Sequence, residues 1–240
     1  MFIVFSVVIF FSIVQSIFGV GLLVFGTPTL MLLGYDFFSA AAILLPCSLS
    51  ISAMQSLLGR SQITIFKYSL LIYSIPPIAI SLFMVSHASS IIDLKVLVAI
   101  VMLSSAIIRS SENLSNRVAL FFRKRQKPYI VFMGGLHGMS NMGGALLTIM
   151  VTSVYENKKD IRSNIAYGYM IFATIQLLVL ITLKPELTAV FDPLLPLLAL
   201  LTYLAVDNFL FVHIAEKVFK HSITILMGLY ALTLIYSSIN

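Results

Sequence analysis

Long apolar stretches follow one another along this chain with few polar residues between them. Each continues for about twenty residues, the length that a helix needs to cross the hydrocarbon layer of a membrane. Hydrophobic residues make up 60% of the 240 positions and charged residues only 10%, whereas a soluble domain carries about 25% charged residues. A transmembrane barrel would instead show short segments of alternating polarity. The sequence therefore predicts an all-α, polytopic membrane helix bundle.

The apolar stretches predict about eight spans. The first is too long for one straight helix. Because no positively charged segment precedes it, we expect a retained span rather than a cleaved signal. The predicted spans cover residues 3–33, 38–58, 66–86, 90–108, 129–153, 161–183, 190–212 and 221–238.

A long polar stretch separates the fourth span from the fifth. Residues 109–127 contain six basic residues and one acidic residue, and short loops rich in Lys and Arg stay in the cytoplasm. We therefore expect a multi-pass inner-membrane protein with a basic cytoplasmic linker between a first repeat (1–108) and a second repeat (128–240). An even number of spans on each side would also place both termini in the cytoplasm and the basic turn at 158–162 outside.

The two halves of the chain resemble each other weakly. Gly21 aligns with Gly143 at an offset of 122 residues, and each glycine-rich stretch leads through a polar turn into a helix with a polar stripe. Duplication with interrupted spans at matching positions is typical of secondary transporters, whose substrate sites lie at the interruptions. The sequence leaves open whether the two halves are parallel or inverted.

Each glycine cluster is dense enough to break a helix, because glycine costs about 1 kcal/mol relative to alanine in a helix interior. We predict that the first span unwinds between Gly19 and Pro28, and the fifth span between Gly138 and Gly144. A restarted helix presents free N–H groups and the positive end of its dipole, which attract an anion. The alternative is that the glycines only allow close helix packing.

Polar side chains share faces of the neighbouring spans. Ser48, Ser52 and Gln55 are spaced i, i+4 and i+7 on the second span, and Gln176 lies on the sixth. Because glutamine is costly in hydrocarbon without a partner, Gln55 and Gln176 should point into the bundle. They could line a pathway for the substrate, or they could only join the helices to one another.

His137 lies inside the second glycine cluster. An imidazole titrates near neutral pH, so His137 could carry a coupling proton or contact an anion. Its counterpart in the first half is Gln15, which is polar and does not titrate. The alternative is an uncharged histidine that hydrogen-bonds to a neighbouring carbonyl.

Other reactive groups give weaker signals. Asp207 lies late in the seventh span and is read either as an intramembrane functional carboxylate or as an interfacial residue. The sequence shows no hydrolase or nucleotide-binding motif, the four histidines are scattered, and Cys47 is the single cysteine. We therefore expect no enzyme activity, no cofactor and no metal site, and nothing in the charge pattern indicates nucleic acid binding.

The two glycine motifs resemble the duplicated signature of the TauE/SafE permeases. Residues 16–21, Ser-Ile-Phe-Gly-Val-Gly, match the first copy of the family pattern, although Leu22 stands where a further glycine is usual. The second copy lies at residues 137–144, where Ser140 and Asn141 replace an aromatic–glycine pair. The resemblance extends over nearly the whole chain in length, span number and duplication, but only these two motifs are specific.

The resemblance implies a secondary permease, often an exporter, of sulfite, a sulfonate or another small organic anion in a lipid bilayer. Protons are the expected coupling ion, and one half would rock against the other. A membrane scaffold or assembly subunit is the alternative, and the sequence leaves open the anion, the direction of transport and a homo-oligomeric state. The candidate substrate-binding residues are Gln15, Gly19, Gly21, Thr27, Ser48, Ser52, Gln55, His137, Ser140, Asn141, Gly143, Gly144 and Gln176.

Overall fold

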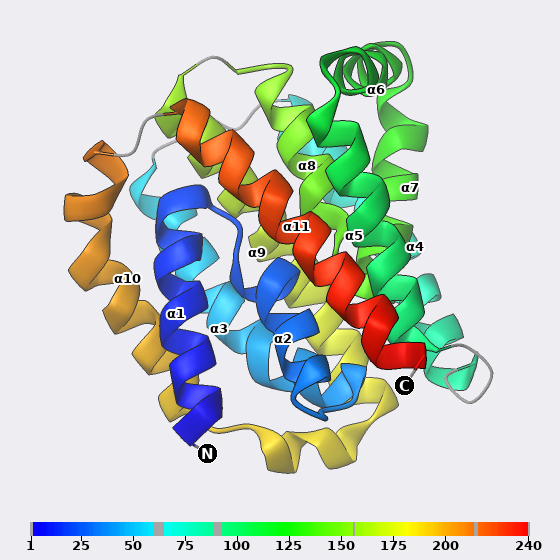
Figure 1. Cartoon of the computed structure of the whole chain (residues 1–240), viewed down its shortest axis with the longest axis vertical. Helices are drawn as coiled ribbons and strands as arrows, with labels where there is room; N and C mark the ends of the chain where they lie inside the picture. Colours follow the sequence, from blue (N-terminus) through cyan, green and yellow to red (C-terminus); the bar gives the residue numbers. More distant parts are fainter. Residues whose placement is uncertain (1, 60–64, 89–92, 156, 214–215, 240) are drawn as a thin grey trace.

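The computed structural model describes residues 2–59, 65–88, 93–155, 157–213 and 216–239, and helices dominate this part of the chain (Figure 1). No strand occurs among these residues, so the predicted all-α membrane bundle is confirmed. The elements are α1 (Phe2–Phe18), η1 (Leu22–Gly26), α2 (Thr27–Leu32), α3 (Phe37–Leu58), α4 (Ile65–Ala88), α5 (Leu94–Ser110), α6 (Glu112–Lys124), α7 (Gln126–Ser140), α8 (Gly143–Thr152), α9 (Lys158–Leu183), η2 (Pro185–Val190), α10 (Leu194–His213) and α11 (Glu216–Ile239).

Helix length separates these elements into two kinds. Within the described residues, α3, α4 and α9 are each long and apolar enough to cross a membrane on their own. The pair α5 and α6 passes the same test together, but the two helices are bent by 103° relative to each other. The remaining apolar helices, including α1, α8 and most of α10, are shorter.

Short polar turns set where several helices begin. The Asp36 carboxylate accepts hydrogen bonds from the backbone N–H groups of Phe38 and Ser39 at 2.9 and 3.0 Å, which caps α3. Asp93 caps α5 and Asn157 caps α9 in the same way. Each cap satisfies N–H groups that have no acceptor within the helix, so the polar turns fix the helix starts.

The first predicted span folds into a hairpin rather than one broken rod. Helix α1 ends at Gly19, whose φ of 69° reverses the chain and whose N–H donates to the Gln15 carbonyl at 2.8 Å. The chain then runs back along α1 through η1 and α2, so that the rings of Phe11 and Phe25 stack with centroids 6.2 Å apart. A side chain at Gly21 would come within 2.8 Å of the Phe11 carbonyl, and glycine is required there.

The fifth predicted span forms a second hairpin with the same construction. Helix α7 ends at Asn141, whose φ is 62° and whose N–H donates to the His137 carbonyl at 2.8 Å. Helix α8 returns along α7, and the Tyr129 hydroxyl donates to the Leu146 carbonyl at 2.8 Å. A Cβ at Gly143 would lie 2.9 Å from the Met133 carbonyl.

The two hairpins correspond residue by residue at the predicted offset. Gly19 and Asn141 are the left-handed residues that end the first arms, and Gly21 and Gly143 are the glycines that press against the arms. Both pairs are 122 residues apart. The break was predicted, but the reversal of the chain after it was not.

The most extensive helix contacts join the first half of the chain to the second. They come in matching pairs: α4 packs on α7 as α10 packs on α1, and α4 packs on α9 as α10 packs on α3. Helix α3 also packs on α9, and α5 on α11. The halves therefore interleave and do not form two separate lobes.

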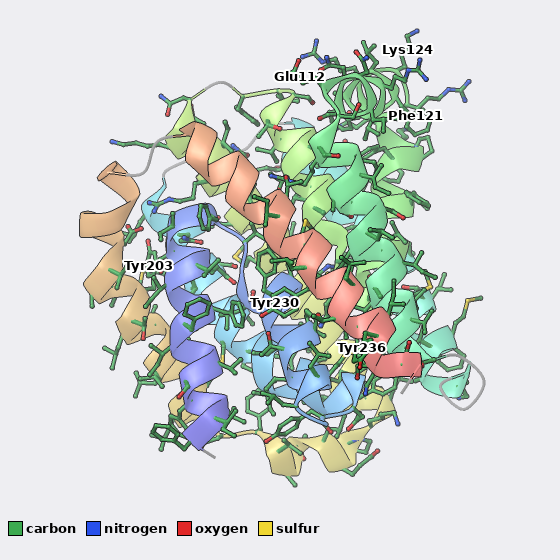
Figure 2. The ribbon with its side chains drawn as sticks, viewed as in Figure 1. Glu112, Phe121, Lys124, Tyr203, Tyr230 and Tyr236 are labelled. Carbon is green, nitrogen blue, oxygen red and sulfur yellow. The ribbon has the colours of Figure 1, made fainter. Side chains whose placement is uncertain are left out.

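The basic segment 109–127, predicted as a polar linker, contains helix α6. The Ser111 hydroxyl accepts from the Leu114 N–H and caps it. Helix α6 lies across the end of the bundle that is uppermost in Figure 1, here called the upper end. Figure 2 shows Glu112, Phe121 and Lys124 on this helix. Most of the predicted linker is therefore a helix that lies across the end of the bundle.

The hairpins correct the predicted position of the termini. Both ends of the chain lie toward the lower end of the bundle, opposite α6 (Figure 1). The first hairpin opens toward the lower end and the second toward the upper end, so the halves have inverted orientations. The prediction of both termini on the side of the basic linker is wrong, because each interrupted segment turns back and adds a reversal that span counting omits.

The same correction moves the basic segment 158–162, which forms the start of α9 and not a turn. It lies at the upper end beside α6, where the Arg123 guanidinium donates to the Ser153 carbonyl at 2.5 Å. At the lower end, two acidic and two basic residues line one surface cavity: Asp36, Asp93, Lys95 and Lys184. The excess of basic residues therefore gathers at the upper end.

Candidate functional site

The predicted site side chains lie in the interior of the bundle. All the polar members are buried, and the glycines among them are buried as well. They form two groups, one at the turn of each hairpin. The buried polar members are Gln15, Thr27, Ser48, Ser52, Gln55, His137, Ser140, Asn141 and Gln176.

The group at the first hairpin is held by hydrogen bonds among its own members. The Gln15 amide nitrogen donates to the hydroxyls of Ser48 and Ser52 at 3.3 and 3.1 Å. The Gln15 amide oxygen accepts from the Leu22 N–H at 3.2 Å. Gln55 donates to the carbonyl of Gln15 at 3.1 Å. The polar face of α3 therefore holds the end of α1, which is the helix-joining alternative that the sequence left open.

The two hairpins meet through Asn141. Its side-chain nitrogen donates to the Thr27 hydroxyl of α2 at 3.0 Å, and its side-chain oxygen accepts from the Gln176 amide of α9 at 2.5 Å. Asn141 thus ends α7 with its backbone and links both halves with its side chain. The Ser140 hydroxyl stays local and donates to the Leu136 carbonyl at 2.7 Å.

His137 is fully buried and neither ring nitrogen has a hydrogen-bond partner. Its ring lies 4.5 Å from that of Phe172 and 6.1 Å from that of Tyr169, measured between centroids. Gln176 lies beside the imidazole without the geometry of a hydrogen bond. The structure therefore does not contain the carbonyl hydrogen bond that the sequence offered as an alternative. A buried polar group without a partner is costly and needs an explanation.

The two hairpins differ at one corresponding pair of side chains. In the first hairpin the Gln15 amide oxygen accepts a hydrogen bond from the Leu22 N–H, at the start of the returning arm. The position that corresponds to Leu22 is Gly144, in the first turn of α8, and the corresponding side chain is His137. His137 forms no hydrogen bond. At the start of α8 the Met142 N–H donates to the Ser140 hydroxyl and the Ala145 N–H to the Met142 carbonyl, each at 3.2 Å. The N–H groups of Gly143 and Gly144, in the first turn, precede the acceptors that a helix supplies to its later residues.

The Tyr169 hydroxyl lies beside the start of α8. Tyr169 is fully buried, and its hydroxyl has no hydrogen-bond partner. A Cβ at Gly144 would lie 1.4 Å from that hydroxyl oxygen, so only glycine leaves room for it at the start of α8. A helix N-terminus, an imidazole and a phenol therefore converge in the interior, and neither ring nitrogen of His137 nor the Tyr169 hydroxyl has a hydrogen-bond partner. This arrangement can bind an anion, because N–H and O–H donors and the helix dipole all favour negative charge.

The Asp207 carboxylate has partners from two helices. Its carboxylate forms an ion pair with Arg162 of α9 and accepts from the Tyr203 hydroxyl at 3.2 Å. Arg162 also donates to the Ser16 carbonyl at 3.1 Å, near the end of α1. Figure 2 shows Tyr203 on α10 beside α1. This cluster connects α1, α9 and α10 at the upper end.

Two residues of interest were not among the candidate site residues. Tyr169 shares a face of the sixth predicted span with Gln176, seven positions later, but only Gln176 was taken as a candidate. Arg109 was counted with the basic linker, although it lies in the last turn of α5. In the part of the chain that the structure describes, no group of three or more His, Cys, Asp or Glu side chains could hold a metal ion.

A comparison with protein families matches residues 4–240 to the family described as "Sulfite exporter TauE/SafE". The match covers essentially the whole chain. Neither a curated protein nor a solved structure matches it.

Proposed function

The chain belongs to the TauE/SafE sulfite exporter family, and we propose that it is a secondary permease of a small organic or sulfur-containing anion such as sulfite or a sulfonate. The family consists of membrane transporters rather than enzymes. In our proposal the anion binds at the second hairpin, at the N-terminus of α8.

The open start of α8 is the observation that carries this proposal. An anion in a membrane interior needs compensation for the water that it loses. The N–H groups of Gly143 and Gly144 and the positive end of the α8 dipole supply it without a full charge in the lipid. The buried His137 and Tyr169 are the neighbouring donors that lack partners. In the first hairpin the Gln15 amide already occupies the corresponding position.

Protons are the proposed coupling ion, since the sequence contains no nucleotide-binding motif. A proton on His137 would add positive charge beside the anion, so binding of the two would be mutually favourable. The titratable side chain in contact with this imidazole is Tyr169 on α9.

The proposal is tested by uptake into proteoliposomes with an imposed proton gradient. Labelled sulfite, small sulfonates and small carboxylates are the substrates to compare. Gradient-dependent accumulation of one of these anions is the expected result. Folded protein that moves none of them, with either polarity of the gradient, would favour the scaffold subunit instead.

The substitution His137→Gln tests the proposed proton carrier. It copies Gln15 of the first hairpin, so the new amide can accept from the start of α8 and the protein should remain folded. We expect slower transport that no longer varies with pH across the range in which an imidazole titrates. The matched control is His87→Gln at an exposed position on α4, which should leave transport and its pH dependence unchanged. Unchanged pH dependence in His137→Gln would remove this residue from the coupling mechanism.

We also propose that the upper end of the bundle faces the cytoplasm. The basic helix α6 and the basic start of α9 both lie there, and cytoplasmic segments are enriched in Lys and Arg. Both ends of the chain would then lie on the opposite side of an inner membrane.

A further inference from the structure

One face of helix α6 packs against the bundle. Phe122 is buried on this face, and its ring meets that of Tyr129 on α7 edge to face, with centroids 5.4 Å apart. On a neighbouring flank the Arg123 guanidinium donates to the Ser153 carbonyl at the end of α8. The bend of 103° after α5 turns α6 across the bundle end. These contacts fix the rotation of α6 about its own axis, and therefore which side chains face outward.

Two rows of side chains follow the outward side of α6. Leu114 and Phe121 are seven positions apart and form an apolar row, with exposed fractions of 37% and 50%. Arg117 and Lys124 lie three positions further on and form an exposed basic row beside it. Figure 2 shows Phe121 on the side of α6 nearer the bundle and Lys124 on the far side. From the bundle outward, the order is thus buried Phe122, the apolar row and the basic row.

This order matches the layers of a lipid leaflet. A helix that lies in the plane of a leaflet places its apolar side chains among the acyl chains and its basic side chains at the level of the headgroups. The flexible stems of Arg and Lys help their charges to reach that level. The segment 109–127 contains six basic residues and one acidic residue, so the complementary headgroup is negatively charged.

We infer that α6 is a lipid-recognition surface that selects phospholipids with a net negative headgroup, such as phosphatidylglycerol. Arg117 and Lys124 bind the lipid phosphate, and Leu114 and Phe121 contact the acyl chains of the same lipid. The inference concerns the lipid beside α6. It goes beyond the proposed permease function and does not depend on which anion is transported.

The basic row supplies the selectivity in this arrangement. Phosphatidylcholine offers the apolar row the same acyl chains and carries the same phosphate, but its own ammonium balances that charge and is repelled by Arg117 and Lys124. Each basic residue close to an anionic membrane surface favours binding by about fivefold. A comparison of the two lipids therefore isolates the contribution of the basic row.

The test uses a fluorophore on α6. The chain contains no tryptophan, so Phe121→Trp introduces a single one into the apolar row. The full-length protein is reconstituted into mixtures of phosphatidylcholine and phosphatidylglycerol, in which one lipid at a time carries brominated acyl chains that quench a tryptophan in contact with them. Phosphatidylglycerol should occupy the site beside Trp at least about fivefold more strongly than phosphatidylcholine. About 1 M salt should weaken this preference, because it screens exposed charges.

The control for position is Phe83→Trp on α4. Phe83 is also 50% exposed, and α4 ends at the lower end of the bundle, far from α6 (Figure 1). Trp at this position should be quenched by both lipids without the same preference. If Phe121→Trp does not fold, Leu114→Trp probes the same apolar row.

The controls for charge are two double substitutions in the Phe121→Trp protein. Arg117→Gln with Lys124→Gln changes only exposed side chains and should abolish the preference while quenching by phosphatidylcholine remains. Lys95→Gln with Lys184→Gln removes the same charge from the lower end and should leave the preference unchanged.

Three outcomes would overturn the inference. Equal occupancy by the two lipids beside α6 excludes selection, and a preference that survives the loss of Arg117 and Lys124 excludes the basic row as its cause. Absence of quenching by either lipid would show that α6 faces water, as it would if it docked a soluble acidic protein. None of these outcomes bears on anion transport, which the uptake experiment tests separately.

Discussion

The residues at the two hairpin turns share one backbone conformation but differ in what their side chains do. Gly19 and Asn141 hold the same left-handed conformation, with φ values of 69° and 62°. Glycine enters this region without strain, and asparagine is among the few other residues that tolerate it. Gly19 therefore only turns the chain, whereas Asn141 turns it and also binds Thr27 and Gln176. The second turn is the one in which side chains connect the halves.

At the same scale, we predict that Gly144→Ala disturbs the site through Tyr169. The new Cβ would occupy the position of the phenol oxygen, so the ring must move or the protein must unfold more easily. We expect a loss of stability of about 1–3 kcal/mol and a loss of anion binding. Adding Tyr169→Phe should recover part of the stability but not the binding. Unfolding temperature and methanesulfonate titration measure the two effects.

The control for this substitution is Gly135→Ala on α7. Nothing lies within 4 Å of a Cβ built at Gly135, and alanine favours a helix by about 1 kcal/mol over glycine. Gly135→Ala should therefore be neutral or stabilising. Equal behaviour of the two alanine variants would show that the phenol does not lie where the structure places it.

The topology of the chain depends on the two interrupted helices. The first and fifth apolar segments are long enough to suggest spans, but each folds into two antiparallel arms. Each hairpin therefore opens to one end of the bundle, the lower end for the first and the upper end for the second. Helix α6 then lies across the upper end, with Leu120 and Phe121 about half exposed beside its basic residues. A transverse helix with exposed apolar and basic side chains suits the boundary between lipid and water.

This arrangement predicts opposite labelling of α6 and η2. In a Cys47→Ala background, single cysteines replace Asn116 on α6 or Ala189 on η2, both of which are exposed. A membrane-impermeant maleimide added to intact spheroplasts should label Ala189→Cys, and it should label Asn116→Cys only after the membrane is broken. Labelling of both from the same side would contradict the arrangement of the elements. The reverse pattern would contradict only the proposed cytoplasmic position of α6.

In the whole molecule, the interleaved packing limits how the protein can move. The two halves of the sequence share their largest contact surfaces, so they cannot rock against each other as separate lobes, as the sequence suggested. A transport motion must instead involve groups of helices drawn from both halves. The cluster of Arg162, Asp207 and Tyr203 is one such cross-connection, because it joins α9 and α10 to the end of α1.

We predict that Asp207→Asn destabilises the folded protein by about 1–3 kcal/mol. The change leaves the Arg162 guanidinium, which is only 18% exposed, without its carboxylate. Adding Arg162→Gln should cost less than the sum of the two single changes, because the second removes the unbalanced charge. Thermal unfolding of the four proteins in a double-mutant cycle measures this coupling. Strictly additive effects would show that the ion pair contributes nothing to holding α1 against α9 and α10.

Features that depend on local composition and spacing could be predicted from the sequence. Long apolar runs required helices, because backbone groups in lipid must pair within their own segment. Glycine content located the breaks, and the offset between Gly21 and Gly143 held in three dimensions. The candidate side chains were also correctly assigned to the interior, since polar groups avoid lipid.

Features that depend on contacts between distant residues could not be predicted in this way and were found in the folded protein. The reversal after Gly19 and Asn141 is stabilised by packing of each returning arm against the first, and local propensity does not specify it. The contrast between Gln15, whose amide is satisfied, and His137, whose ring is not, arises from which partners each turn meets. The sequence assigns Arg109 to the basic linker. In the folded protein it ends α5 instead, and its Nε atom is enclosed without a hydrogen-bond partner.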